Sequence, residues 1–161
     1  MAPRSNLRPR LSFLDRLLLD EEVDSVSSPR RDLERLRGAV RRDLEALLNC
    51  RRWSRSWPAT AGELEQSVLG YGLLDMHSQP LATEAQRDLF RRHIEDVILR
   101  FEPRFRSVSV ALLQNVEEVD RTLRFRIQAV LRADADGEPV VYDTQLDPAL
   151  RSFTVTDANH G

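Results

Sequence analysis

The chain changes its hydrophobic periodicity once, at the junction Phe101-Glu102-Pro103-Arg104-Phe105. Before this junction apolar residues recur every three or four positions, as in amphipathic helices. After it they alternate with polar residues, as in strands with one buried face. Helices followed by strands predict an α+β fold, in which N-terminal helices pack on one face of a C-terminal antiparallel β-meander of three to four strands.

Two long helices are predicted before the junction. Ser28 and Pro29 form an N-cap and first-turn pair for a helix that runs to Asn49. Thr83 and Gln86 form a capping box for a helix that ends at the junction. A shorter helix is predicted at residues 63–69, followed by a tight turn at Gly70-Tyr71-Gly72. The apolar stripes of the long helices are Leu33, Leu36, Val40, Leu44, Leu47 and Leu48 in the first, and Phe90, Ile94, Val97, Ile98 and Phe101 in the second.

The strand pattern begins at Val108 and continues through residues 123–131. Asp136-Gly137 is a hairpin signal that leads into a third strand around Val140 and Tyr142. Phe153 and Val155 allow a short fourth strand. Short links between consecutive strands predict a meander.

The domain boundaries follow from composition. Residues 1–10 contain two prolines and three arginines and are predicted to be a disordered tail. Residues 11–28 are predicted to form a short helix and a linker, residues 29–157 one α+β domain, and residues 158–161 a frayed tail. A chain of 161 residues is long enough for one core without disulfides or metals.

Composition narrows the function classes. All 24 basic residues are arginines, 26 residues are acidic, and the formal net charge is -2. This balance argues against a general nucleic-acid binder, while guanidinium groups suit planar pairing with carboxylates at protein interfaces. The single cysteine, Cys50, excludes an internal disulfide and fits a reducing, cytoplasmic compartment. No apolar run of about 18 residues and no signal sequence is found, so we expect neither membrane insertion nor secretion.

The best candidate site is the junction itself, where Glu102, Pro103 and Arg104 are predicted to bind a partner. Proline ends the helix and stiffens the corner. Phe101 and Phe105 are expected to anchor the corner in the core while both charges point elsewhere. The alternative is that these residues only end the helix, as a proline flanked by charged residues commonly does in globular proteins.

A second candidate is the basic and aromatic cluster at residues 51–57. Its arginines and tryptophans could stack nucleobases, but such residues more often fill a core or a protein interface. We therefore take Arg51, Trp53, Trp57 and Tyr71 as possible interface residues.

Catalytic, cofactor and metal sites lack sequence support. The three histidines are far apart, and phosphate-loop and nucleophile-elbow spacings are missing. A glycosidase that uses two carboxylates stays open, because such a pair leaves no sequence signature. Its candidates are Glu63, Glu65, Asp75, Glu95 and Glu102.

Four landmarks occur in order along the chain: Ser12-Phe13-Leu14-Asp15-Arg16-Leu17, residues 43–51 (DLEALLNCR), residues 67–72 (SVLGYG) and Phe101-Glu102-Pro103-Arg104. In this order they resemble the phage baseplate wedge proteins described as lysozyme-like, and above all their type VI secretion relatives, the TssE proteins. Gly70, Leu74 and Cys50 depart from the asparagine, proline and threonine that are frequent in that family.

The resemblance implies a structural baseplate subunit and not a hydrolase. It implies partners TssF and TssG in the wedge, TssK and VgrG nearby, and a platform for the TssB/TssC sheath, at a baseplate docked on the cytoplasmic side of the inner membrane. An exposed sheet edge could accept a sheath strand, and Glu102 and Arg104 could bond to the wedge core. The alternatives are a peptidoglycan-cleaving hydrolase and a nucleic-acid-binding module built on Arg51 to Trp57.

Overall fold

The computed structural model describes residues 29–53, 58–74, 81–114, 122–132, 137–147 and 149–158. The short helix and linker predicted at residues 11–28, both terminal tails except residue 158, and Trp57 lie outside these ranges. Among the described residues, no helix is both long and apolar enough to cross a membrane.

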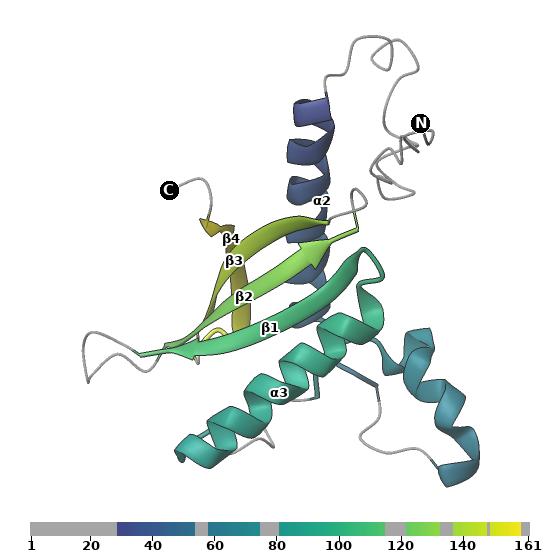
Figure 1. Ribbon diagram of the computed structural model, residues 1–161. Coiled ribbons are helices and arrows are strands. Elements are labelled where there is room, and N and C mark those ends of the chain that lie inside the picture. The colour runs from purple at the N-terminus through teal and green to yellow at the C-terminus, as the bar shows by residue number, and fades with distance from the viewer. Residues whose placement is uncertain are drawn as a thin grey trace.

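Four described strands form one antiparallel sheet in the order β1-β2-β3-β4, which confirms the α+β fold and the meander (Figure 1). The strands are β1 (Phe105–Leu113), β2 (Leu123–Leu131), β3 (Glu138–Asp147) and β4 (Ser152–Asp157). The first strand begins three residues earlier than the alternation at Val108 predicts, directly after the corner. The sheet therefore continues from the candidate site without an intervening loop.

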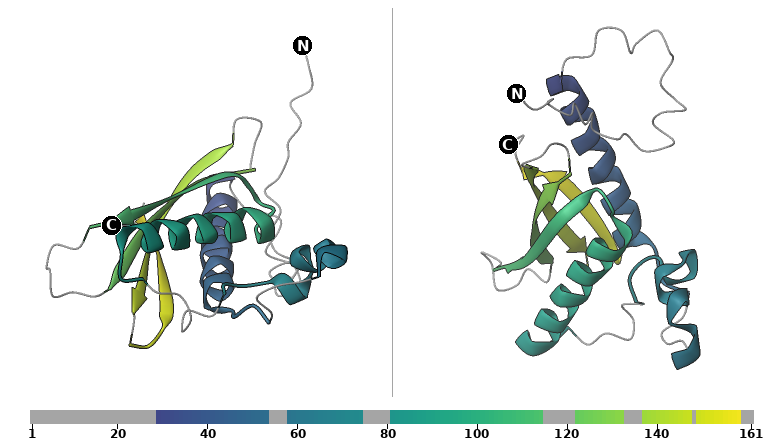
Figure 2. Two further views of the ribbon diagram at one scale, coloured as in Figure 1. Left: turned by 90° about the horizontal axis from the view of Figure 1, so that it is seen from below. Right: turned by 45° about the vertical axis from the view of Figure 1, so that its right-hand side comes forward.

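The two long helices are α2 (Pro29–Asn49) and α3 (Glu84–Phe101), with the predicted bounds. The capping box of α3 is confirmed, because Thr83 and Gln86 each bond to the backbone of the other. The apolar stripes of both helices join the buried face of the sheet in one cluster, which includes Leu44, Ile98 and Phe125. Both helices therefore pack on one face of the sheet. The N-terminal end of α2 extends beyond the sheet (Figures 1 and 2).

The segment between the long helices differs from its prediction. Instead of one helix at residues 63–69, it forms two 3-10 helices, η2 (Ala59–Gln66) and η3 (Val68–Gly70). Ser67 separates them, because its hydroxyl donates to the carbonyl of Leu64 (2.8 Å) and accepts from the amide of Leu69 (3.2 Å). A serine that bonds to the local backbone competes with a continuous helix.

Helix side chains cover both edges of the sheet. On β4, Asn49 of α2 bonds to the amide and carbonyl of Phe153, and Arg41 donates to the carbonyl of Val155. On β1, α3 side chains bond to both backbone groups of Val110. The exposed edge expected from the sequence is therefore occupied at Phe153, Val155 and Val110.

Candidate functional site

The corner between α3 and β1 is built by local backbone bonds. The amide of Glu102 makes the last helical bond, to the carbonyl of Ile98 (2.9 Å). Pro103 cannot continue the helix. The carbonyl of Glu102 then accepts from the amide of Phe105 (3.2 Å), which closes a turn and starts β1. Phe105 is buried, as predicted, and Pro103 is exposed.

The two charges of the corner bind each other. Glu102 Oε1 accepts from the backbone amide of Arg104 (3.1 Å) and from its Nε (2.6 Å), and Arg104 Nη2 donates to Oε2. Only 5% of Glu102 is exposed. The expectation that Glu102 points away from the core is therefore wrong. The carboxylate can be buried because the guanidinium neutralises it and satisfies both of its oxygens.

Arg104 also reaches across to α2. Its Nη2 lies 2.6 Å from Asp43 Oδ2, 61 residues away in the sequence. Burial alone lowers the pKa of Arg104, but the hydrogen bonds and negative charges of Glu102 and then Asp43 outweigh it and raise the pKa above its usual value. Arg104 therefore stays charged and ties α2 to the corner.

Arg132, just after β2, fixes the other side of the corner. Its amide donates to the carbonyl of Arg104 (2.8 Å), and its Nε donates to the carbonyl of Phe105 (3.0 Å). The corner thus has bonds to α2, α3 and the end of β2. These bonds are what the prediction of a stiff corner requires.

Tyr71 lies against the same site. Its ring meets Phe101 edge-on, with the ring centroids 5.4 Å apart. Burial raises the pKa of Tyr71, as do the nearby negative groups, among them Asp43 and Glu102. The structure therefore brings together the Tyr71 turn, the corner and α2, which are separate landmarks in the sequence.

The Tyr71 turn depends on two glycines. Gly72 has φ +100°, and a Cβ at this position would lie 2.3 Å from the carbonyl oxygen of Cys50. A Cβ at Gly70 would lie 2.2 Å from the carbonyl oxygen of Glu65. The turn predicted from the sequence, with its close backbone approach, is confirmed.

The basic and aromatic cluster is only partly described. Arg51 forms a parallel bridge with Leu73, which places it beside the Tyr71 turn, and Arg51 and Trp53 are exposed. The side chain of Arg52 is 8% exposed and pairs with Glu65. One of the arginines proposed for nucleic-acid binding is thus turned inward.

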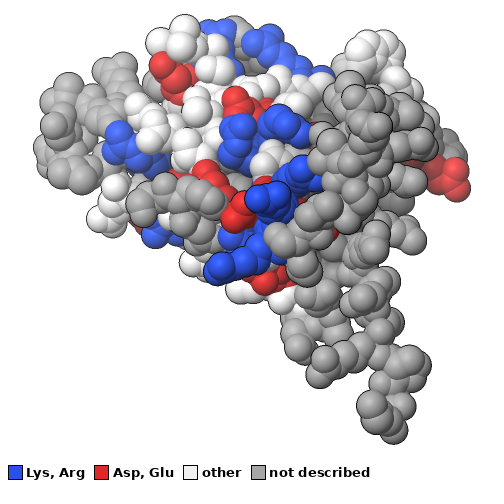
Figure 3. Space-filling model, turned by 90° about the horizontal axis from the view of Figure 1, so that it is seen from above, with Lys and Arg blue, Asp and Glu red and all other residues white. Residues whose placement is uncertain are grey.

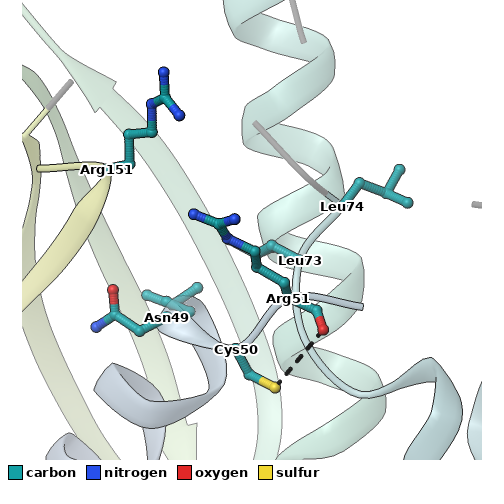
Figure 4. Close-up of a pocket in the computed structure, with 7 residues that line it drawn as sticks. Asn49, Cys50, Arg51, Leu73, Leu74 and Arg151 are labelled. Carbon is teal, nitrogen blue, oxygen red and sulfur yellow. Dashed lines mark hydrogen bonds between the residues drawn. The ribbon is translucent and has the colours of Figure 1, made fainter. Parts of the chain in front are cut away.

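A cavity of about 20 Å³ opens beside Arg51, between the end of α2 and the turn from β3 to β4. Asn49, Arg51 and Arg151 are among the residues that line it (Figure 4). This volume holds about one water molecule, far less than a small-molecule site needs.

Three of the five candidate glycosidase carboxylates are held in ion pairs with arginines: Glu65, Glu95 and Glu102. Glu63 is exposed on η2, and Asp75 lies outside the described residues. None of the four described candidates lines the cavity beside Arg51 or a second, open cavity along α2 that is lined by Arg41, Arg42, Glu45, Ala46 and Asn49. Within the described ranges, no group of three or more His, Cys, Asp or Glu side chains is placed to hold a metal ion. The geometry of these residues gives the hydrolase hypothesis no support.

A model of the family "baseplate wedge protein gp25" matches residues 34–136, more than half of the chain. This chain belongs to the gp25 baseplate wedge protein family. The matched range contains Asp43, Tyr71, Glu102 and Arg104, so the whole ion-pair corner lies inside it. Family membership supports a structural role in a baseplate. A comparison with curated proteins gave no match.

Surface charge fits a protein-binding member of the gp25 family better than a nucleic-acid binder. On the face shown in Figure 3, arginines gather in a band with carboxylates interleaved among them. Several arginines are already paired, for example Arg37 with Glu138 (2.5 Å) and Arg126 with Asp143 (2.7 Å). Paired guanidinium groups contribute little net positive field for a phosphate backbone.

Proposed function

We propose that this chain is the TssE-type wedge subunit of a type VI secretion baseplate, on the cytoplasmic side of the inner membrane. In this role it binds TssF and TssG, lies near TssK and VgrG, and carries the platform from which the TssB/TssC sheath polymerises. The gp25 family match and the four ordered sequence landmarks support the proposal.

The observation that carries the proposal is the ion-pair corner. Asp43, Glu102 and Arg104 form one network that joins α2 to the start of the sheet. The network ties α2 to the corner through one ion pair, between Arg104 and Asp43. We expect it to hold the adjoining exposed surface in one shape for the wedge partners.

Partner contact is assigned to side chains that face outward around this corner. Pro103 is exposed, and 18% of the Arg104 side chain is exposed. Arg51 and Trp53 are exposed, and Arg51 bridges to the segment that contains Tyr71. Trp and Arg are the residues that most often dominate binding energy at protein interfaces. Glu102 is buried, so it contributes indirectly, by fixing the position of the Arg104 side chain.

The test is co-expression of the full chain with TssF and TssG from the same gene cluster, followed by size-exclusion chromatography. We expect wild type to co-elute with both partners, and Arg51→Ala and Trp53→Ala to weaken co-elution without loss of fold. Arg92→Ala is the matched control, because Arg92 is exposed on α3 away from the corner. The proposal fails if wild type forms no complex, and the assigned surface is wrong if both variants co-elute like the control.

A further inference from the structure

The turn between β3 and β4 holds an arginine in a strained backbone conformation. Arg151 has φ +53°, and among the described residues it is the only one other than glycine with a positive φ. Asp147 fixes the turn, because its Oδ1 accepts from the amides of Ala149 (2.7 Å) and Leu150 (3.1 Å). The carbonyl of Asp147 accepts from the amide of Arg151 (2.7 Å). Such a left-handed position favours glycine, so an arginine there points to a use for its side chain.

Arg151 lines the same cavity as Arg51, although the two residues are far apart in the sequence. The cavity of about 20 Å³ at the end of α2 is also lined by Asn49, Cys50 and three leucines (Figure 4). None of these described lining residues is acidic. Two guanidinium groups therefore border one opening, and their combined charge favours an anionic group from a partner.

Exposed apolar side chains accompany both arginines. Arg51 and Trp53 are exposed on either side of Arg52, whose side chain is only 8% exposed. Trp53 is 78% exposed, and Leu150, next to Arg151, is 76% exposed. Trp and Arg are enriched among the residues that dominate binding energy at protein interfaces. We name the following set the basic–apolar surface: Arg51, Trp53, Leu150 and Arg151.

We propose that the basic–apolar surface binds an acidic peptide segment of a partner, and that Arg151 serves this contact and not the fold. Carboxylates of the segment pair with the two guanidinium groups, which donate parallel hydrogen bonds to such groups. An apolar side chain of the segment packs against Trp53 or Leu150. A peptide fits better than a nucleic acid, because an aliphatic side chain such as Leu150 offers a base no ring to stack on. The inference rests on the proposed function for the identity of the partner, but its test does not need that identity.

Two variants of the full chain separate binding from folding. Glycine adopts φ +53° without strain, so we expect Arg151→Gly to melt at the wild-type temperature or up to about 3 °C above it. Asparagine also tolerates this conformation, and Arg151→Asn should melt no lower than wild type. A lower melting temperature in both variants would show that the arginine side chain supports the fold, and would overturn the proposal.

Binding is tested by selecting a random peptide library on the purified full chain and measuring the selected peptides by fluorescence anisotropy. We expect these peptides to carry acidic residues beside a leucine or an aromatic residue. Their affinity should fall at least about ten-fold in Arg51→Ala and in Arg151→Gly, because each variant loses a charge-assisted contact. Arg92→Ala removes an exposed arginine that does not line the cavity, and should bind like wild type. Selection of no acidic peptide, or unchanged affinity in Arg151→Gly, overturns the proposal.

Co-elution with TssF and TssG distinguishes this inference from the proposed function. Arg151→Gly should weaken co-elution as Arg51→Ala does. If wild type binds the acidic peptides but forms no complex with TssF and TssG, the proposed function fails and the acidic-segment surface stands. If the complex forms and Arg151→Gly co-elutes like Arg92→Ala, the inference fails and the proposed function stands. A fluorescent poly-thymidine strand that binds wild type and loses affinity in Arg151→Gly would assign the surface to nucleic acid and overturn the proposal.

Discussion

Asn49 and Phe153 exchange a pair of hydrogen bonds, although 104 residues separate them. The Asn49 amide nitrogen donates to the carbonyl of Phe153 (2.9 Å), and the Asn49 carbonyl accepts from the amide of Phe153 (2.8 Å). The same nitrogen also donates to the carbonyl of Glu45 at the end of α2. One side chain thus caps a helix and continues the hydrogen-bonding pattern of the sheet.

Asn49→Ala should destabilise the fold, because three hydrogen bonds are lost and two backbone groups of β4 lose their partner. We expect the free energy of unfolding to fall by about 1 to 3 kcal/mol, measured by urea denaturation. Asn49→Asp keeps the acceptor but places a negative charge against the carbonyl of Phe153, so it should not restore stability. If the urea midpoint of Asn49→Ala equals that of wild type, these hydrogen bonds contribute nothing to stability.

Glu102→Ala should destabilise the fold more than Asp43→Ala. Removing Glu102 leaves the mostly buried guanidinium of Arg104 with only Asp43, at a cost of about 2 to 4 kcal/mol. Asp43 is 46% exposed, so its loss leaves Arg104 paired with Glu102 and should cost less than about 1 kcal/mol. Arg104→Lys should also destabilise, because an ammonium cannot replace the two-pronged contact. Urea midpoints that rank Asp43→Ala as the most damaging would contradict the central role of Glu102.

Gly72→Ala and Gly38→Ala should have opposite effects. Gly72 combines a positive φ with a Cβ position 2.3 Å from the carbonyl of Cys50, so alanine should destabilise by about 2 kcal/mol or more. Gly38 lies inside α2 with open space around its Cβ position, so alanine should stabilise by about 0.5 to 1 kcal/mol. Thermal melts of both variants test this. Equal shifts of the melting temperature in Gly72→Ala and Gly38→Ala would contradict the strained backbone geometry at Gly72.

Stability should fall as the pH drops below about 6.5, the usual pKa of histidine, in part because of His93. Burial lowers the pKa of His93, as do Arg52 and Arg100, against an opposing effect of Asp96. Its neutral Nε2 accepts from the amide of Leu74 (3.4 Å).

In this range the unfolded chain binds a proton that the folded chain does not, so the His93 contribution is complete above pH 6.5 and is lost as the pH falls. His93→Gln should lose less stability than wild type between pH 7.5 and 5.5 in urea titrations. Parallel pH profiles for the two proteins would exclude His93 as the cause.

The sequence determined the elements of this protein. Periodicity, the Thr83–Gln86 capping box and the proline at 103 specify where α2 and α3 run and where helix gives way to strand, because these signals act within a few residues. The order of elements also gave the meander. The prediction of one helix at residues 63–69 was wrong. The hydroxyl of Ser67 and the glycines at 70 and 72 impose a local geometry there that the spacing of apolar residues does not indicate.

Only the tertiary structure decided how the candidate site works. The sequence identifies Glu102 and Arg104 as a candidate site, but the burial of Glu102 and the contact of Arg104 with Asp43, 61 residues away, depend on how the elements pack. The bonds of Arg91 and Glu95 to Val110 and of Asn49 to Phe153 likewise join residues that share no sequence pattern. Local sequence signals fix backbone conformation, whereas the choice of partner for a charged or polar side chain depends on which elements the buried core brings within hydrogen-bonding distance.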